Sequence, residues 1–432
     1  MRIHFIGIGG IGVSALAKYY YSKGAEITGS DLTSSEITQY FTDKGVKINI
    51  GHKSEVVNDK IELVIYSPAI QEDNPERKKA NKLKIKTLSY PQALGELTKN
   101  HFTIAVAGSH GKSTIVALLG TLLKEAGLDP TVIVGTRVKE FGNSNELTGN
   151  SKYLIIEACE HFSSFLNYQP QIIVLSNIEP DHLEFYGNIE NLLKGFRAFI
   201  DKLPKDGLLI ANKDSENIRK IVSLDDKIEW FSLKDKEKEE IKKVIKIPGD
   251  FNISNALAVW KVAQELNIKN SLFLDVLSKY ESSWRRFEII QINHPKQYTL
   301  INDYAHHPTQ LRETLKAARD KYPHKEIWCF FQPHQYQRTD YLFNEFVESL
   351  RNAPVNRIYI DDIYEVSGRE SQEIKDKVNS QKLIRAINKE SVKYLPQNKI
   401  IEFLNNNIKG GEIIIIAGAG NIYDIALKII GK

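Results

Sequence analysis

Apolar runs and amphipathic stretches alternate along this chain in a regular order. An apolar run occupies residues 102–107, and apolar side chains then recur at helical spacing at Ile115, Leu118, Leu119, Leu122 and Leu123. A continuous apolar run is typical of a buried parallel strand, so the pattern predicts a strand, a turn and a helix. Gly127 and Pro130 are expected to end that helix.

The turn predicted between this strand and this helix has the sequence GSHGKS. Unpaired backbone N–H groups and the positive end of the helix dipole attract anions, and Gly108 and Gly111 let the backbone approach a phosphate closely. Lys112 can reach the terminal phosphates of a nucleotide, and the Ser113 hydroxyl can bind magnesium. The strict phosphate-loop pattern needs a glycine where Val106 stands, so an ordinary glycine–serine turn is the alternative.

The same alternation recurs on both sides of this segment and divides the chain into three α/β units. We place these units at residues 1–98, 99–283 and 284–432. Within the central unit, apolar runs at 152–160 and 171–182 both end in charged residues. We therefore predict an α/β fold of three consecutive domains: a Rossmann-like N-terminal domain, a central phosphate-loop ATPase domain and a Rossmann-like C-terminal domain.

The first unit carries a glycine pattern of its own, with Gly7, Gly9 and Gly12 between a predicted strand and a predicted helix. Asp31 ends the next predicted strand, at the spacing where an acidic residue meets a ribose in Rossmann units. Alone, these residues predict a site for a nucleotide diphosphate, with NAD as the default ligand. A turn that only packs a helix onto a strand is the alternative.

Two charged residues, Glu157 and His182, end predicted strands of the central unit. Ligands of open parallel sheets lie at the carboxyl ends of the strands, so we expect both side chains to face the crevice of the GSHGKS turn. A carboxylate there can hold magnesium, whereas His182 suits either a metal or phosphate role or a structural one. Asn252 and Asn255 lie near a predicted helix start, where they suit an adenine edge or a helix cap equally.

Composition narrows the possible partners. The 432 residues include 58 basic and 54 acidic side chains, with no basic stripe among aromatic residues, so we expect no nucleic-acid partner. No apolar run is long enough to cross a bilayer and the opening segment lacks a signal-peptide pattern, so we expect no membrane partner. Cys159 and Cys329 are the two cysteines, which does not suit a disulfide framework and favours a cytoplasmic protein.

The motifs of the three units occur together in one known family. The chain resembles the ATP-dependent Mur ligases along nearly its whole length, through the stretches GIGGIGVSALA, GSHGKS, NIEPDH, RRFE, DYAHHPT and FQPHQYQRT. That family has a shortened phosphate loop of the type G-[ST]-x-G-K-[ST], which accounts for Val106. Within the family, the motifs are most similar to those of the members that add L-alanine to UDP-N-acetylmuramate.

The resemblance implies a ligase of peptidoglycan precursor synthesis. Such an enzyme joins L-alanine to the carboxylate of UDP-N-acetylmuramate through an acyl phosphate, at the expense of ATP and with Mg²⁺. The resemblance further implies that the first domain binds the UDP-sugar rather than NAD, at Gly7, Gly9, Gly10, Gly12, Asp31 and Ser67. We expect the enzyme to be a monomer or a weak homodimer.

Roles for residues of the later units follow from the same resemblance. ATP is expected at seven consecutive residues of the turn and the helix start, and at four later residues. They are Gly108, Ser109, His110, Gly111, Lys112, Ser113 and Thr114, and then Asn252, Asn255, Arg286 and Asp303. The expected metal ligands are Ser113, Glu157 and His182. The expected catalytic residues are Lys112, His182, His334 and Arg338, with His334 as the base, and Tyr336 is expected to face the amino acid.

Three positions depart from the family pattern. Cys159 stands where Mur ligases usually have aspartate, Phe251 where histidine is common, and Gln335 where the alanine-adding members usually have arginine. Loss of that arginine removes a bidentate clamp for a carboxylate. The stretch EFGNSNELT is also similar to recycling members, which attach a whole peptide to the same UDP-sugar. A recycling-type ligase, an NAD-dependent oxidoreductase and a regulatory nucleotide-binding protein are therefore the alternatives.

Overall fold

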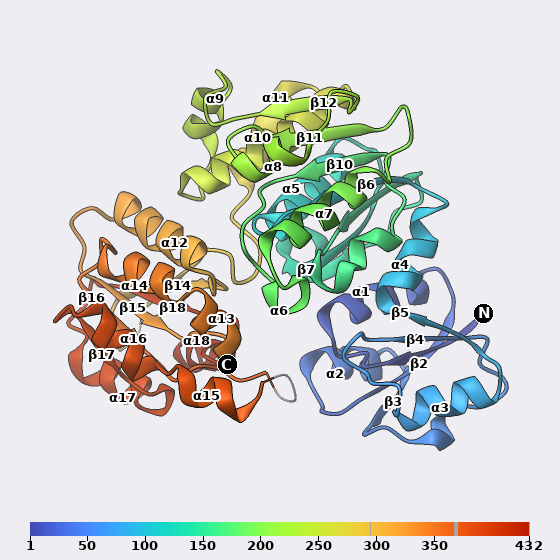
Figure 1. Ribbon diagram of the computed structural model, residues 1–432, viewed down its shortest axis with the longest axis horizontal. Coiled ribbons are helices and arrows are strands. Elements are labelled where there is room, and N and C mark those ends of the chain that lie inside the picture. The colour runs from blue at the N-terminus through green and yellow to red at the C-terminus, as the bar shows by residue number, and fades with distance from the viewer. Residues whose placement is uncertain (294, 367–369, 432) are drawn as a thin grey trace. The chain divides into compact units, whose positions relative to one another are not determined.

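The computed structural model describes residues 1–293, 295–366 and 370–431, which form three β-sheets flanked by helices (Figure 1). Each sheet is built from one consecutive stretch of the chain, which confirms the predicted α/β class. The chain divides into two compact units, one of Met1–Pro180, Asn188–Ile241 and Ser254–Ser278 and one of Asp181–Gly187, Lys242–Ile253 and Lys279–Lys432. The domain boundaries placed after residues 98 and 283 stay predictions.

The first sheet has five parallel strands in the order β3-β2-β1-β4-β5. They are β1 Arg2–Ile6, β2 Glu26–Asp31, β3 Lys47–Ile50, β4 Leu63–Tyr66 and β5 Lys86–Ser89. The helices of this part are α1 Ile11–Ser22, α2 Glu36–Asp43, α3 Pro75–Lys82 and α4 Tyr90–Thr98, with a 3₁₀ turn at Ser54–Val56. The strand order reverses at β1, so the glycine turn that follows β1 lies at the switch point where α/β sheets bind ligands.

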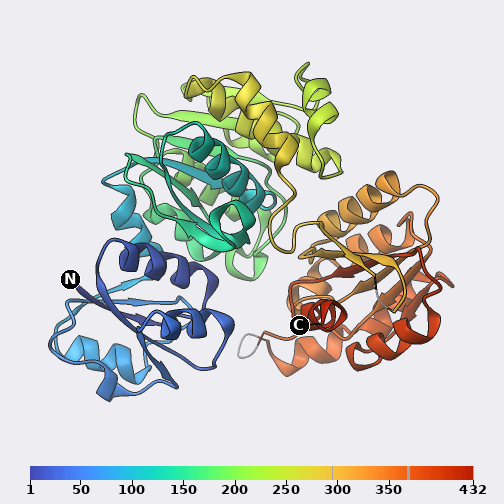
Figure 2. The same ribbon diagram turned by 180° about the vertical axis from the view of Figure 1, so that it is seen from behind.

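The central sheet has seven strands in the order β12-β11-β10-β6-β9-β7-β8, of which β8 pairs antiparallel with β7. They are β6 Phe102–Ala107, β7 Thr131–Val138, β8 Ser144–Leu147, β9 Tyr153–Glu157, β10 Ile172–Leu175, β11 Leu208–Asn212 and β12 Ile228–Phe231. The helices are α5 Lys112–Glu125, α6 Leu183–Tyr186, α7 Ile189–Ile200, α8 Glu216–Ile221, α9 Lys238–Val244, α10 Asp250–Glu265 and α11 Asn270–Lys279, with 3₁₀ turns at Lys139–Phe141 and His161–Asn167. Helices cover both faces of this sheet, with α7 in front in Figure 1 and α5 in front in Figure 2.

The third sheet has six strands in the order β13-β14-β18-β15-β16-β17, and its edge strand β13 is antiparallel. They are β13 Glu288–Ile292, β14 Tyr298–Asp303, β15 Ile327–Phe331, β16 Arg357–Ile360, β17 Val392–Tyr394 and β18 Ile413–Ala417. The helices are α12 Pro308–Lys321, α13 Tyr336–Tyr341, α14 Phe343–Arg351, α15 Gln372–Lys377, α16 Ser380–Ile387, α17 Gln397–Asn407 and α18 Tyr423–Ile430.

Burial on both faces explains why these strands are continuous apolar runs. In β18, Ile413 and Ile415 join one core cluster, while Ile414 and Ile416 join the cluster on the opposite face. Successive side chains of a strand point to opposite faces, so a central strand between two helix layers is apolar at every position. Of the helices in the described part of the chain, none has both the length and the apolar character needed to cross a bilayer.

Two predicted strands are longer in the sequence pattern than in the structure. The run 152–160 forms β9 only as far as Glu157, and the run 171–182 forms β10 only as far as Leu175. The residues beyond each strand leave the sheet and form loops at its carboxyl edge. These loops carry many of the candidate site residues.

Candidate functional site

The GSHGKS segment forms the predicted turn between β6 and α5. Gly108 and Gly111 both have left-handed backbone conformations, with φ of +130° and +86°. A Cβ added to Gly108 would lie 2.2 Å from the Ser176 hydroxyl oxygen, and one added to Gly111 would lie 2.4 Å from Asn255 Oδ1. Only glycine fits either position, because the turn is strained for other residues and tightly enclosed. The backbone is therefore held close to its surroundings, as a phosphate-binding turn requires.

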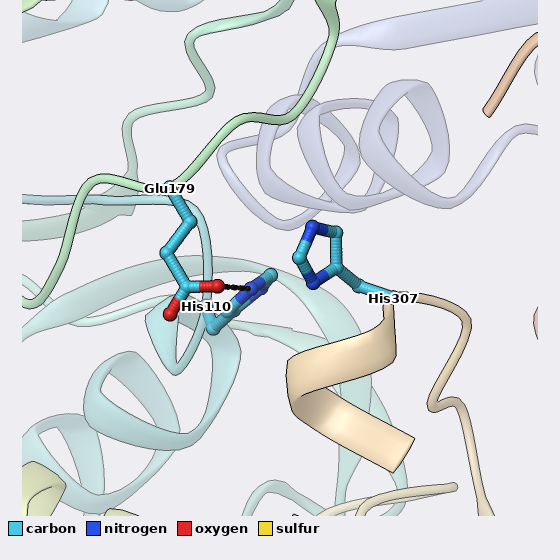
Figure 3. Close-up of side chains that lie close together, drawn as sticks. All are labelled: His110, Glu179 and His307. Carbon is cyan, nitrogen blue, oxygen red and sulfur yellow. Dashed lines mark hydrogen bonds and ion pairs between the residues drawn. The ribbon is translucent and has the colours of Figure 1, made fainter. Parts of the chain in front are cut away.

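The loop after β10 braces this turn. The Ser109 N–H donates to the Asn177 carbonyl at 3.0 Å, and the His110 N–H donates to Asn177 Oδ1 at 2.9 Å. The Ser109 hydroxyl donates to the Glu179 carbonyl at 3.1 Å, and the His110 ring lies 3.3 Å from the Glu179 carboxylate (Figure 3). The NIEPDH stretch thus shapes the turn through its first residues, a role that the sequence did not reveal.

Lys112 forms an ion pair with Glu160, a residue that sequence reasoning missed. Lys112 Nζ lies 3.0 Å from Glu160 Oε2 and also donates to the Gly108 carbonyl. The Glu160 side chain is only 1% exposed, so it is a buried charge with a cationic partner. Burial alone would lower the pKa of Lys112, but the charge of Glu160 and its hydrogen bond outweigh burial, and the pKa is raised. Lys112 is therefore charged at neutral pH.

Cys159 carries no charge at this site. Burial and the neighbouring Glu160 carboxylate raise the pKa of the Cys159 thiol to about 12, so the thiol stays protonated at neutral pH. Where the family usually has an aspartate, this chain therefore has a neutral group. Glu160 and Glu157 supply the negative charge on either side of it.

Glu157 lies on the strand next to the turn. It ends β9, and its register partner on β6 is Val106, two residues before the glycine turn begins. Its Oε1 accepts a hydrogen bond from the Gly135 N–H at 2.9 Å, which fixes the carboxylate at the sheet edge. Ser113 and Thr114 are buried in the first turn of α5. The structure thus brings the turn, Glu157 and Asn255 together within one unit, whereas His182, which was expected at the same crevice, belongs to the other unit.

The glycine turn of the first sheet is built differently. Gly7 has φ of +80°, and a Cβ added to it would lie 3.0 Å from the Ser67 Cβ. The Gly9 N–H donates to Asp31 Oδ2 at 2.8 Å, so the acidic residue predicted to meet a ribose also holds the turn. A Cβ on Gly12 would lie 2.9 Å from the Tyr90 ring, which places Tyr90 against the turn. No pattern in the sequence indicates Tyr90, since it lies 78 positions from Gly12.

In the second compact unit, Asp181 contacts two of the predicted site residues, and a third, His334, contacts one of these two. The His182 N–H donates to Asp181 Oδ1 at 2.9 Å, and Arg338 Nη2 donates to the same oxygen at 3.2 Å. Arg338 Nη1 lies 3.2 Å from His334 Nδ1, and the His334 ring stacks on Tyr364. Both members of the Arg338–Asp181 ion pair are buried, which makes this a fixed arrangement.

His182 has a second acidic neighbour. Its Nδ1 lies 3.3 Å from Glu184 Oε1, and its own backbone is left-handed, with φ of +54°. Burial opposes ionisation of Glu184, but the hydrogen bond from His182 lowers the pKa of that carboxyl on balance. Asp181 and Glu184 are further residues that sequence reasoning missed, although both flank His182 in the NIEPDHLE stretch.

The remaining predicted residues lie on or near the third sheet and on α10. Asp303 accepts hydrogen bonds from the Phe287 and Ala305 N–H groups at 2.8 and 2.7 Å, and burial raises its pKa against the opposing effect of Arg286. The Arg286 guanidinium lies 5.0 Å from the centre of the Tyr304 ring. Asn252 is buried and donates to the Pro248 carbonyl at 2.7 Å, so part of its amide serves the local fold.

Gln335 and Tyr336 mark the start of α13. Gln335 has a left-handed backbone with φ of +71°, and its N–H donates to the Tyr364 carbonyl at 2.9 Å. Tyr336 is half-buried, and burial raises the pKa of its hydroxyl, so it is neutral at physiological pH. The loop predicted to face the amino acid is thus a defined structure anchored to Tyr364.

Comparisons with known proteins cover almost the whole chain. Residues 2–102 match the model of the Mur ligase family, catalytic domain; residues 106–263 match the Mur ligase middle domain; and residues 285–420 match the Mur ligase, glutamate ligase domain. The UDP-N-acetylmuramate–L-alanine ligase of Caldanaerobacter subterraneus subsp. tengcongensis is 36% identical, over 99% of this chain and 97% of that protein.

Two solved structures share the fold over the full length. The UDP-N-acetylmuramate-alanine ligase of Thermotoga maritima superposes with a TM-score of 0.80 at 25% identity, covering 100% of this chain and 98% of the other. A murein peptide ligase of Psychrobacter arcticus superposes with a TM-score of 0.72 at 21% identity, again covering 100% and 98%. The second similarity concerns the fold alone.

Proposed function

The chain belongs to the Mur ligase family, and from that premise we propose that it is an ATP-dependent ligase joining L-alanine to the carboxylate of UDP-N-acetylmuramate. The observation that carries this proposal is the glycine turn before α5, with Lys112 paired to Glu160 and Glu157 on the adjacent strand. A ligase that uses ATP needs a lysine-bearing phosphate turn beside a carboxylate suited to Mg²⁺, whereas an NAD-dependent oxidoreductase needs neither. The full-length similarity to an alanine-adding ligase agrees with this choice.

The proposed reaction has two steps. The muramate carboxylate attacks the γ-phosphorus of ATP, which breaks the bond to the β-phosphate oxygen and yields ADP and an acyl phosphate. The amino group of L-alanine then attacks the acyl carbon, expels inorganic phosphate and loses a proton as the amide forms. Both steps bring anions together, so the main tasks of the protein are positioning and charge neutralisation.

The residues of the first unit suit the first step. Backbone N–H groups of the turn and the Lys112 ammonium would hold the ATP phosphates as charge develops on the leaving group. The Ser113 hydroxyl and the Glu157 carboxylate are oxygen donors of the kind that Mg²⁺ prefers, and both lie at the carboxyl edge of the central sheet. Bound there, the metal would neutralise phosphate charge. His182 is a nitrogen donor and is proposed as a further ligand.

The residues of the second unit suit the acceptor and the acyl group. Arg338 and Arg286 supply positive charge, and the Arg338 guanidinium is fixed by Asp181. His334 is the proposed base for the amine; for that role its Nδ1 must exchange the Arg338 contact for the amino group. Asn252, Asn255 and Asp303 are proposed for the adenine and ribose side of ATP, and Tyr336 for the amino acid.

Phosphate release tests the proposal directly. Purified protein is mixed with ATP, Mg²⁺, UDP-N-acetylmuramate and one acceptor at a time, and inorganic phosphate is measured. We expect release with L-alanine. Release only with a peptide acceptor would make the recycling-type ligase the better assignment, and no release with any acceptor would overturn the ligase. Calorimetry should show binding of UDP-N-acetylmuramate and none of NADH; the reverse result would favour the oxidoreductase.

Gln335 makes the choice of acceptor testable. Glutamine donates hydrogen bonds without charge, whereas a charge-assisted bond is worth about 1.5–3 kcal/mol against about 1 kcal/mol for a neutral one. We expect L-alanine to be used with a high KM and Gln335→Arg to lower that KM about tenfold. The KM values for ATP and UDP-N-acetylmuramate should change little. Loss of activity in Gln335→Arg would contradict the alanine assignment.

Two further expectations complete the proposal. We propose a cytoplasmic enzyme, because its nucleotide substrates are made there, and a monomer or weak homodimer. Sedimentation over a range of protein concentrations would test the second point.

A further inference from the structure

Helix α1 lies along the hairpin strand β8 of the central sheet, and polar contacts join the two from end to end. Asn145 contacts the first half of the helix, the Ser22 hydroxyl donates to the Thr148 hydroxyl at 2.9 Å, and Lys23 Nζ donates to the Gly149 carbonyl at 2.8 Å. The helix residues involved in these contacts, Ile11, Ser14, Lys18 and Ser22, fall on one face. Lys23 directly follows α1, and Thr148 and Gly149 directly follow β8. This contact, here called the α1–β8 joint, links the first sheet to the central one.

Asn145 is the centre of the joint. Its Nδ2 donates to the Ile11 carbonyl at 2.6 Å and to the Ser14 hydroxyl at 2.9 Å, and its Oδ1 accepts from Lys18 Nζ at 2.8 Å. Asn145 is 2% exposed, and its contact with Ser14 is fully buried, while those with Ile11 and Lys18 are partly buried. Loss of the side chain would leave three polar groups of α1 without this partner, among them the buried Ser14 hydroxyl.

One side of Asn145 adjoins the glycine turn of the first sheet. Ile11 is the first residue of α1 and directly follows Gly10. The Ser14 hydroxyl itself donates to the Ile11 carbonyl at 2.9 Å, which ties the first turn of the helix together. Asn145 therefore fixes the very end of α1 that carries the proposed diphosphate site.

The other side of Asn145 leads to Glu157 through two strand pairings. Its neighbour Glu146 pairs with Ile133 on β7, and Ile133 pairs with Ile156 on β9, the residue before Glu157. Two strand spacings amount to about 10 Å. The Gly135 N–H, on the same strand β7, also donates to the Glu157 carboxylate. A short and rigid path thus runs from the first glycine turn to the proposed metal carboxylate.

From this path we propose that Asn145 is a positioning residue that sets the distance between the UDP-sugar site and the phosphoryl-transfer site. The inference rests on the proposed function. UDP-N-acetylmuramate carries its diphosphate and its reacting carboxylate on one sugar ring, so their separation is confined to a narrow range. The protein must hold its two sites at a matching distance, because a displacement of about 1 Å can cost about a hundredfold in rate.

Asn145→Ala tests the proposal, with Asn270→Ala as the matched control. Asn270 also joins two elements of the central part, since its Oδ1 accepts from Trp260 Nε1 and its Nδ2 donates to Glu240, but it is exposed and not part of the joint. We expect kcat of Asn145→Ala to fall about tenfold to a hundredfold, with ATP affinity measured by calorimetry within twofold of wild type. The control should keep wild-type kcat. Assays are run at a temperature where circular dichroism shows every variant folded.

A cross-link at the far end of the joint separates positioning from a merely structural role. The Ser22 and Thr148 hydroxyl oxygens are 2.9 Å apart, so Ser22→Cys with Thr148→Cys can form a disulfide after a small adjustment. Reduced, this pair should have wild-type activity. Added to Asn145→Ala, it should restore kcat at least fivefold on oxidation and lose the gain on reduction, with each single cysteine variant unaffected by the oxidant.

The outcomes separate the two proposals. An inactive wild-type protein overturns the proposed function. An active wild type with Asn145→Ala at the rate of the control overturns the positioning role alone. A fall in kcat that the cross-link does not restore also overturns it, since the defect then lies outside the α1–β8 distance.

Discussion

The glycine turns after β1 and β6 both lead from a buried strand into a helix, but they differ in the charge of the side chains beside them. The turn after β1 directs a carboxylate at itself, since Asp31 accepts from the Gly9 N–H. The turn after β6 carries a cation, Lys112, which pairs with Glu160. Both turns offer backbone N–H groups at a helix N-terminus, so both are anion sites by geometry. The side chains beside them decide how much negative charge each one accepts.

This difference matches the two ligands proposed. A diphosphate linked to a nucleoside brings limited charge together with ribose hydroxyls, which can donate to a carboxylate such as Asp31. A triphosphate that transfers its terminal group brings more charge and develops further charge on the leaving oxygens, so it needs a lysine and a metal. On this proposal, one backbone motif serves two tasks, and the side chains beside each turn determine which ligand it binds.

Removing the cation should have the largest effect. Lys112→Met combined with Glu160→Gln removes both buried charges, whereas Lys112→Ala alone would leave Glu160 buried without its partner, at a cost of about 3–5 kcal/mol. We expect the double variant to fold. Its rate of phosphate release at saturating substrates should fall by about a thousandfold or more. The single variant Glu160→Gln is the control for the acidic partner. Phosphate release near the wild-type rate would contradict the claim that the turn after β6 needs the Lys112 cation.

The second prediction compares an enclosed position of the turn after β6 with an open position of the turn after β1. A Cβ on Gly108 would meet the Ser176 hydroxyl oxygen at 2.2 Å, with φ at +130°, so Gly108→Ala should destabilise the protein by about 3 kcal/mol or more and abolish activity. Gly10 has φ of −66°, and a Cβ there would come no closer than 3.4 Å to the Gly7 carbonyl oxygen. Gly10→Ala should therefore change the free energy of unfolding by less than about 0.5 kcal/mol. Denaturant unfolding measures both, and equal effects would contradict the contrast.

The smallest effect is expected for Asp31→Asn, which keeps the size of the side chain and removes its charge. The Gly9 N–H then loses a charge-assisted hydrogen bond, and the ribose loses its acidic partner. We expect the KM for UDP-N-acetylmuramate to rise about tenfold while the KM for ATP and kcat stay within twofold. Steady-state kinetics with each substrate varied in turn measures this. A rise in the KM for ATP would show that the two turns are not assigned to separate ligands.

Local patterns in the sequence were sufficient to predict the strand–turn–helix units. Apolar runs, helical spacing and glycines act over a few residues, so β6, α5 and both glycine turns lie where the sequence places them. Strand ends were less predictable: the run 152–160 continues past Glu157 in apolar character, although the chain leaves the sheet there. The sheet edge depends on the neighbouring strands, which are far away in the sequence.

The partners of the site residues could not be predicted in the same way. Glu160 lies 48 positions from Lys112, Arg338 lies 157 from Asp181, and Asn145 lies 134 from Ile11. Such pairs depend on how the elements pack, and a single sequence holds no record of that packing. The family resemblance supplied expected roles for Lys112 and Glu157, but it did not indicate which side chain neutralises Lys112.

The position of β8 has a consequence for how the protein can be divided. This strand is the outer edge of the seven-stranded sheet, and α1 packs against it through the Ser144 and Asn145 side chains. An uncovered edge strand offers unpaired backbone groups to any other strand and promotes aggregation. Residues 99–283 expressed alone would expose this edge, so they should self-associate, whereas a fragment that also contains residues 1–98 should remain dispersed. We therefore expect helix α1 to limit self-association through β8 as well as to support the glycine turn before it.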